Sequence, residues 1–234
     1  MRYLMWTYYA PLSAHSVVAT GQDITTRSRP TRTGVIGVLA SCLGIERTQV
    51  ADLSALHDGI GIAVRVDAAG ARVTDYHTAM VPRGEQARGQ RSRWHELQAG
   101  RPEAQQTYRD YIVGGLYTVA HWERVRPKVT LDRIRAALLK PVFVPFAGRT
   151  CCSFALPFDP LIVEADGLLA AFTQRPMRPE IAELLHLKQQ PAVEVASDED
   201  GGLTDGRIEQ IMDRYAGLRA WSARNQIVTE IANG

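Results

Sequence analysis

The clearest alternation of hydrophobic and polar positions lies at residues 60–66, where Ile and Val recur at every second residue. A period of two predicts a β-strand. The turn at 67–70 then predicts a returning strand at 73–78. Two further stretches, 3–9 and 111–122, are rich in aromatic and apolar residues, which favours strands at both.

A helical pattern with both ends marked occupies residues 30–45. Thr31 or Thr33 can accept a hydrogen bond from an otherwise unpaired backbone N–H and so cap the N-terminus. Gly44 stands where a left-handed residue ends a helix. Four apolar residues recur at helical spacing on one face: Val35, Val38, Leu39 and Cys42. A second helix is predicted from a Thr130 cap to Leu139, with Leu131, Ile134 and Leu138 on one face.

The second face of the first helix carries almost no side chains, because Gly34, Gly37 and Ser41 lie along it. Each glycine costs roughly 1 kcal/mol of helix stability relative to alanine, which indicates that something packs against bare backbone there. A helix N-terminus also attracts anions. Three arginines crowd the same end: Arg27, Arg29 and Arg32. Together these features predict a binding site for a phosphate backbone. The alternative is close packing of the helix on a sheet, with ordinary surface arginines.

Residues 80–109 combine arginines and glycines with few acidic or apolar side chains. This composition cannot build a core, and the stretch is longer than a normal hairpin loop. Trp94 and His95 place aromatic rings among the basic residues, which is typical of an arm that binds nucleic acid. A disordered surface loop is the alternative. The arginines between residues 80 and 101 are Arg83, Arg88, Arg91, Arg93 and Arg101.

Residues 141–157 form a loop interrupted by Pro and Gly, with Lys140 and Arg149 as flanking cations. The loop can lay backbone N–H groups and both cations along RNA; the alternative is a packed, proline-stiffened loop. For the rings of Phe143 and Phe146, inward packing is the favoured interpretation.

The pattern weakens beyond residue 160. We expect a short helix from an Asp166 cap to Phe172 and another at 180–187, whereas 207–215 and 224–231 fit either helix or strand. Residues 161–234 are therefore interpreted as a small C-terminal appendage.

The order of elements in residues 1–160 reads β-α-β-β-α-β, with the arginine-rich insertion between strands. This order predicts an α+β protein with a ferredoxin-like (RRM-like) core. The sheet of such a fold commonly hosts RNA, although the fold alone does not establish the function.

The net charge of +2 conceals an asymmetry along the chain. Residues 1–150 hold twenty Lys and Arg against twelve Asp and Glu, whereas 151–234 hold seven against thirteen. This asymmetry suggests that one surface meets a polyanion. Nearly all the basic residues are arginine, whose guanidinium group binds phosphate through two N–H groups and stacks on bases. A GC-rich genome would also favour arginine, but would not explain the asymmetry.

Three cysteines, two of them adjacent, offer neither a disulfide framework nor metal-ligand spacing. We therefore expect three buried thiols, a cytoplasmic protein, and no metal or cofactor. No apolar run is long enough to span a bilayer, and residues 1–9 are too short an apolar stretch for a signal peptide.

Specific motifs point to a family. Residues 30–37 read Pro-Thr-Arg-Thr-Gly-Val-Ile-Gly, and Cys-Leu-Gly-Ile follows at 42–45. This pattern resembles the signature of the CasD family. Asp-Tyr-His-Thr at 75–78 and the stretch from Leu139 to Cys151 agree with that family in order and spacing. The resemblance covers residues 1–160, although residues 10–15 depart from the family's Gly-Pro-x-x-Ala-Trp pattern.

CasD is the subunit of type I-E CRISPR Cascade, a complex of antiviral defence, that holds the 5′ handle of the guide RNA (crRNA). The resemblance therefore implies a RAMP-superfamily fold with a thumb at 80–109. It implies that the protein caps the filament of the backbone subunit CasC, helps to dock the large subunit CasA, and meets target DNA only indirectly, with no membrane partner. The expected RNA-binding residues are Arg27, Arg29, Thr31, Arg32, Thr33, Gly34, Gly37, Tyr76, His77, Arg83, Arg88, Arg91, Arg93, Lys140 and Arg149.

A catalytic alternative uses Tyr76, His77 and Lys140. A metal-independent endoribonuclease that cleaves CRISPR repeat RNA needs a base and a cation, roles that these residue types can fill. Tyr76 and His77 are neighbours on a predicted strand, however, and so point to opposite faces. We therefore expect a non-catalytic RNA-binding protein; a third possibility is an adaptor that contacts protein only.

Overall fold

The computed structural model describes residues 1–15, 21–81, 92–98, 103–124, 127–187, 192–214 and 221–232. The strands are β1 (Arg2–Tyr9), β2 (Leu12–Ser13), β3 (Asp23–Ile24), β4 (Ile60–Ala68), β5 (Ala71–Val81), β6 (Glu103–Val113), β7 (Leu116–Glu123), β8 (Leu161–Glu164), β9 (Ala192–Asp198), β10 (Arg207–Arg214) and β11 (Trp221–Ala232). The helices are α1 (Arg32–Leu43), α2 (Val50–Gly59), α3 (Arg93–Gln98), α4 (Leu131–Leu139), α5 (Leu168–Thr173) and α6 (Pro179–Leu184), with a 3₁₀ turn at Glu199–Gly201.

Most of these strands form one antiparallel sheet, which has seven strands within the described residues, in the order β10-β11-β9-β4-β7-β1-β8. Strand β4 lies at its centre, and the next two strands, β7 and β1, pair in unbroken register from Leu4↔His121 to Tyr9↔Leu116. The last three strands of the chain extend this sheet beyond β4. The protein is thus a mixed α/β structure built around a large antiparallel sheet.

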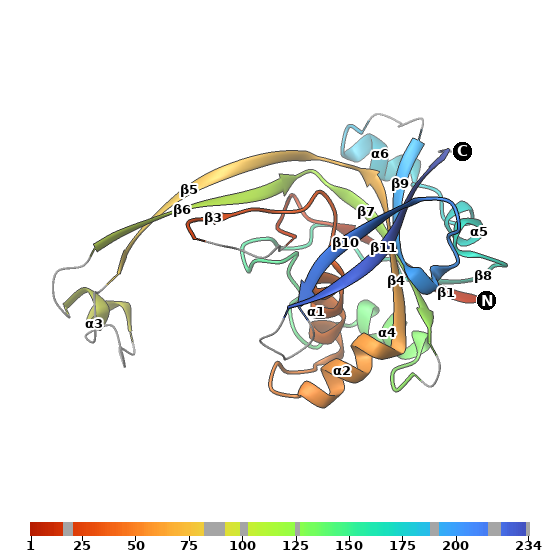
Figure 1. The fold of residues 1–234 in the computed structure, drawn as a ribbon, viewed down its shortest axis with the longest axis horizontal. Helices are drawn as coiled ribbons and strands as arrows, with labels where there is room; N and C mark the ends of the chain where they lie inside the picture. The colour runs from red at the N-terminus through yellow and green to blue at the C-terminus, as the bar shows by residue number, and fades with distance from the viewer. Residues whose placement is uncertain are drawn as a thin grey trace.

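A second sheet leaves the body of the molecule. Strands β5 and β6 pair over their whole length, from Ala71↔Val113 to Val81↔Glu103, and β2 and β3 add short pairings to β6. Figure 1 shows this ribbon projecting to one side, with α3 near its far end. We call the pair β5–β6 the hairpin arm.

Side chains alternate along β1 and so feed two separate cores. Leu4, Trp6 and Tyr8 are buried in one cluster with residues of α1, α2 and α4, whereas Tyr3 and Met5 are buried in another with residues of α5. Both faces of the central sheet are therefore covered.

The predicted helix ends are confirmed where they depend on local contacts. Thr31 caps α1, Gly44 ends it with a φ of 74°, and Thr130 caps α4. The apolar residues predicted for α4, at positions 131, 134 and 138, are buried. Helix α2 had no counterpart in the sequence-based prediction, and no side chain caps its start.

Several strand predictions need correction. The strand at 73–78 does not return along β4: it belongs to β5 and pairs with β6, while β4 pairs with β7 and β9. Regular strand structure also enters the 80–109 stretch at both ends. Helix α5 starts at Leu168 behind Gly167, so Asp166 is not its cap.

The C-terminal residues continue the main sheet. Strand β8 pairs with β1, and β9 pairs with β4, so residues on both sides of position 160 share one hydrogen-bonded layer. The stretches at 207–215 and 224–231, which fit either helix or strand by sequence, contribute β10 and β11. The C-terminal stretch is therefore a structural part of the sheet that supports α1.

Candidate nucleic-acid interface

The glycine face of α1 is open at Gly37. Thr31 Oγ1 accepts a hydrogen bond from Gly34 N at 3.2 Å, and that oxygen is the nearest atom to a Cβ built at Gly34, at 3.3 Å. A Cβ built at Gly37 would meet no atom within 4 Å. At Gly37 no described part of this chain packs on the bare backbone that the sequence predicts to be covered, whereas Gly34 is half-buried beside Thr31, and Ser41 Oγ donates to Val144 O at 3.3 Å. The face is therefore available to a separate molecule, at a helix end that favours anions.

The arginines at this helix end have internal partners. Arg29 is 7% exposed and donates to Glu194 Oε1 at 2.7 Å and to Glu209. Arg32 is 3% exposed and pairs with Asp198. Both guanidinium groups thus bind carboxylates from the C-terminal strands. Neither is the ordinary surface arginine of the packing alternative, and the predicted binding of phosphate by these two residues stays a prediction that their ion pairs do not favour. Arg27 is half-buried.

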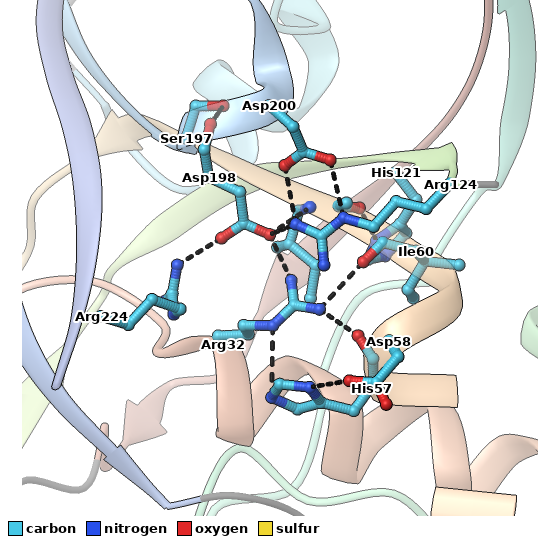
Figure 2. A network of polar contacts seen from close by, with 12 residues as sticks. Arg32, His57, Asp58, Ile60, His121, Arg124, Ser197, Asp198, Asp200 and Arg224 are labelled. Atoms are coloured by element: carbon cyan, nitrogen blue, oxygen red, sulfur yellow. Dashed lines mark hydrogen bonds and ion pairs between the residues drawn. The ribbon is translucent and has the colours of Figure 1, made fainter. Parts of the chain in front are cut away.

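Asp198 is the centre of a buried polar network, which Figure 2 shows from close by. It accepts from Arg32, Arg124 and Arg224, at 3.0 Å in the case of Arg124 Nη2. Arg124 also binds Asp200 through two hydrogen bonds of 2.6 and 2.7 Å. Burial acts to raise the pKa of Asp200, but the hydrogen bonds and charge of Arg124 bring the pKa below its ordinary value. The hydrogen bond to Asp200 correspondingly raises the pKa of Arg124.

The hairpin arm carries an exposed pair of aromatic rings. Tyr76 and Tyr108 face each other in register across β5 and β6, with ring centroids 5.4 Å apart, and are 51% and 44% exposed. His77 is the next residue along β5, so it points to the opposite face, where its Nε2 lies 2.7 Å from Asp75 Oδ2. Tyr108 was missed by the sequence analysis, because only the register of β5 with β6 brings it to Tyr76.

Part of the predicted arm lies outside the described residues, namely Arg83, Arg88, Arg91 and Arg101. Arg93 begins α3 and is exposed. Trp94 follows it with 66% of its surface exposed, and its ring meets that of His95 edge-on with centroids 5.0 Å apart. The described tip of the arm thus presents an aromatic ring beside a cation.

The loop after α4 lies against the C-terminal end of α1. Val142 N donates to Cys42 O at 3.0 Å, and Phe143 N donates to Ser41 O at 3.1 Å. Phe143 is 45% exposed, so its predicted inward packing is wrong, whereas Phe146 is half-buried. Lys140 is exposed directly before this loop.

Arg149 joins the loop to the base of the arm. Its guanidinium carbon lies 4.4 Å from the ring centroid of Tyr111, and its Nη1 donates to Asp110 O at 3.2 Å. Gly148 precedes it with a φ of 97°, and a Cβ there would lie 1.9 Å from Ala14 O. Only glycine fits that close approach, which holds Arg149 in place beside β6.

The sheet face beneath α5 is closed. Phe172 is fully buried there, and Arg65 lies over its ring at 5.3 Å. Arg65 donates to Asp67 Oδ1 at 2.6 Å, and burial raises the pKa of Asp67 against the lowering effect of that guanidinium. The strands under α5 are therefore covered by the protein itself on this face.

The three cysteines differ in their surroundings. Cys42 and Cys152 are buried, and burial raises their pKa values to about 12 and about 11, but Cys151 is exposed, contrary to prediction. Within the residues that the structure describes, no group of His, Cys, Asp and Glu has the geometry to hold a metal ion. No helix among those residues is long and apolar enough to cross a membrane.

The model of a protein family described as "CRISPR-associated protein (Cas_Cas5)" matches residues 3–225 of this chain. The chain belongs to the Cas5 family. It is also 33% identical over 136 residues to the CRISPR system Cascade subunit CasD of Escherichia coli (strain K12). That alignment covers 55% of this chain and 56% of the relative, so the chain spans little more than half the length of the curated Cas5 relative that it matches.

Solved structures share the fold of this Cas5 protein. A chain from a structure described as "CRISPR RNA-guided surveillance complex" superposes with a TM-score of 0.63 and 18% identity, covering 99% of this chain and 90% of the other. A second, described as "Crystal structure of Cas protein", gives a TM-score of 0.56 with 20% identity, covering 99% and 94%. At these identities the likeness concerns the fold alone.

Proposed function

We propose that this Cas5 protein is the non-catalytic subunit of a type I-E CRISPR surveillance complex that holds the 5′ handle of the guide RNA. The observation that carries the proposal is the open backbone face of α1. Two glycines cost this helix stability, no described part of the chain covers Gly37, and the helix lies within the residues that the Cas5 family model matches.

The RNA path that we propose begins at the α1 N-terminus. The N-terminal end of α1 at Thr33 and Gly34 binds phosphate, with Thr31 holding the helix end through the Gly34 N–H and Arg27 nearby. Lys140 and Arg149 flank the path on the adjoining loop, because that loop is hydrogen-bonded to the other end of α1. Tyr76, with Tyr108, offers rings on which a base of the handle stacks.

The hairpin arm serves as the thumb of the subunit. Its long paired strands lead away from the main sheet to α3 (Figure 1). This end of the arm contacts a neighbouring backbone subunit, CasC. The tip residues Arg83, Arg88, Arg91 and Arg93 then contact guide RNA or that neighbour. The core strands, in the order β4-β7-β1-β8 and connected by helices, correspond to a ferredoxin-like unit of the RAMP type.

The same placement gives the protein its position in the assembly. It caps one end of the CasC filament and helps to dock CasA, in antiviral defence in the cytoplasm. The proposal that it does not cut RNA is supported by β5, on which Tyr76 and His77 face opposite ways, so that one scissile phosphate cannot meet both.

The test uses the purified chain with CRISPR repeat RNA in EDTA. The proposal predicts a shifted band on a native gel and an intact RNA on a denaturing gel. Cleaved RNA would establish the endoribonuclease alternative instead. RNA that is neither shifted nor cleaved would favour a protein-only adaptor.

A further inference from the structure

The N-terminus of α1 is tied to the C-terminal strands by buried ion pairs. Arg32, the first residue of the helix, lies against Asp198 at the end of β9. Asp198 is 4% exposed and also accepts from Ile62 N in β4 at 3.1 Å, which fixes the carboxylate relative to the central sheet. Figure 2 shows the guanidinium groups of Arg124 and Arg224 converging on the same carboxylate.

The guanidinium of Arg32 has further acceptors on the side away from Asp198. Its Nη2 donates to Ile60 O at 2.9 Å and to His57 O, and its Nε donates to His57 Nε2 at 3.4 Å. With 3% of the residue exposed, a phosphate would reach Arg32 only by displacing these partners. Arg32 is therefore built into the protein as a structural cation.

A second ion-pair cluster holds the chain just before the helix. Arg29 binds Glu194 of β9 and Glu209 of β10, and Arg207 binds the same two carboxylates at 2.9 Å. Thr31, the cap of α1, lies between Arg29 and Arg32 in the sequence. The backbone that enters the helix is consequently attached on both sides of the cap to strands β9 and β10.

We infer that Asp198 and Arg32 are positioning residues for the glycine face of α1, so that the C-terminal strands govern its affinity for RNA without contacting the RNA. This inference rests on the proposed function. Its physical basis is that removing one partner of a buried ion pair leaves an uncompensated charge, which the structure relieves by shifting the attached elements. Here those elements are the first turn of α1 and the end of β9.

Asp198→Asn separates this inference from direct contact, because the two predict opposite signs. If Arg32 binds phosphate, loss of its internal carboxylate frees it, and affinity for handle RNA rises with a steeper salt dependence. If Arg32 positions the helix, affinity falls about 2- to 30-fold, the range measured for coupled positions that do not touch the ligand. The slope of log affinity against log salt then stays as in the parent protein.

Glu199→Gln is the matched control, since it removes the same charge at the next residue. Glu199 is exposed and bonds Asn225 at 3.2 Å, outside the Arg32 ion pair. Its RNA affinity should equal that of the parent protein. Thermal melting followed by circular dichroism ensures that binding is compared between folded proteins.

Arg32→Gln keeps the test decisive if Asp198→Asn fails to fold. The inference predicts weaker binding with an unchanged salt slope, whereas a lost phosphate contact flattens the slope by about 0.7. A flattened slope in Arg32→Gln, or tighter or unchanged binding in folded Asp198→Asn, would overturn the inference. Failure of the parent protein to bind handle RNA would instead overturn the proposed function.

Discussion

Replacing Gly37 should move stability and RNA binding in opposite directions. The residue lies in the interior of α1, is exposed, and has space for a Cβ without any contact within 4 Å. Gly37→Ala should therefore stabilise the fold by about 1 kcal/mol, the difference in helix propensity between the two residues. Gly37→Val should leave the fold at least as stable as the parent, because valine is also a better helix former than glycine.

Handle RNA should bind these variants less well, and valine should weaken binding more than alanine. The added atoms occupy the space through which we propose that the RNA approaches the backbone. Urea denaturation measures the stability change, and fluorescence anisotropy with labelled handle RNA measures the affinity. Gly167→Ala is the matched control for RNA binding. A Cβ there also meets nothing within 4 Å, but the residue is the N-cap of α5 and not part of α1.

The two measurements refute different parts of the reasoning. A Gly37→Ala protein that is less stable than the parent would show that the space above the helix is not free. A valine variant that is folded and binds like the parent would show that RNA does not approach this face. In that case the glycines would have no part in recognition.

Two further predictions concern pH and the hairpin arm. Burial lowers the pKa of His15 and of His121 to about 3. The unfolded chain takes up protons near pH 6.5 and the folded chain does not, so the free energy of unfolding should fall between pH 6.5 and 3 by about 1.4 kcal/mol per pH unit for each histidine. Urea midpoints that stay constant from pH 7 to 5 would contradict the burial of these two histidines in their neutral form. For the arm, deletion of 84–100 with a short Gly-Ser bridge should spare the melting temperature, because β5 and β6 stay paired at their base, but should reduce incorporation into the guide complex. Trypsin should cut the free protein first within 83–101 and should spare this stretch in the assembled complex; equal resistance in both states would indicate an independently folded tip.

Features that depend on near neighbours in the chain were predictable. The cap at Thr31 bonds a residue three positions away, and Gly44 ends α1 through bonds to Ala40 and Ser41. Such contacts are encoded within one turn of helix, so residue type and spacing are sufficient to find them.

The roles of Arg29 and Arg32 were not predictable in this way. Their carboxylate partners lie 165 and 166 residues away in sequence, for Glu194 and Asp198 respectively. In the sequence, an arginine near the start of a helix gives the same pattern whether it binds phosphate or a distant acidic side chain. Only the pairing of β9 with β4 brings Asp198 to α1.

The charge asymmetry of the chain acquires a second explanation from these contacts. Part of the acidic C-terminal stretch neutralises arginines of the basic N-terminal stretch inside the protein, at Asp198, Glu194 and Glu209. The excess of positive charge in residues 1–150 is thus not all available to a polyanion. The C-terminal strands were also hard to assign, because the edge strand β10 exposes apolar side chains such as Ile208 and so lacks a simple alternation.

The most direct test of the central claim is photo-crosslinking of guide RNA that carries a photoreactive nucleotide in its 5′ handle. Trypsin cuts after Arg32 and Arg47, so the whole of α1 beyond its first residue lies in the single peptide 33–47. Our account predicts that mass spectrometry finds the handle nucleotide attached to this peptide, and that Gly37→Val reduces the yield. Crosslinks confined to the C-terminal strands, with none in 33–47, would contradict it.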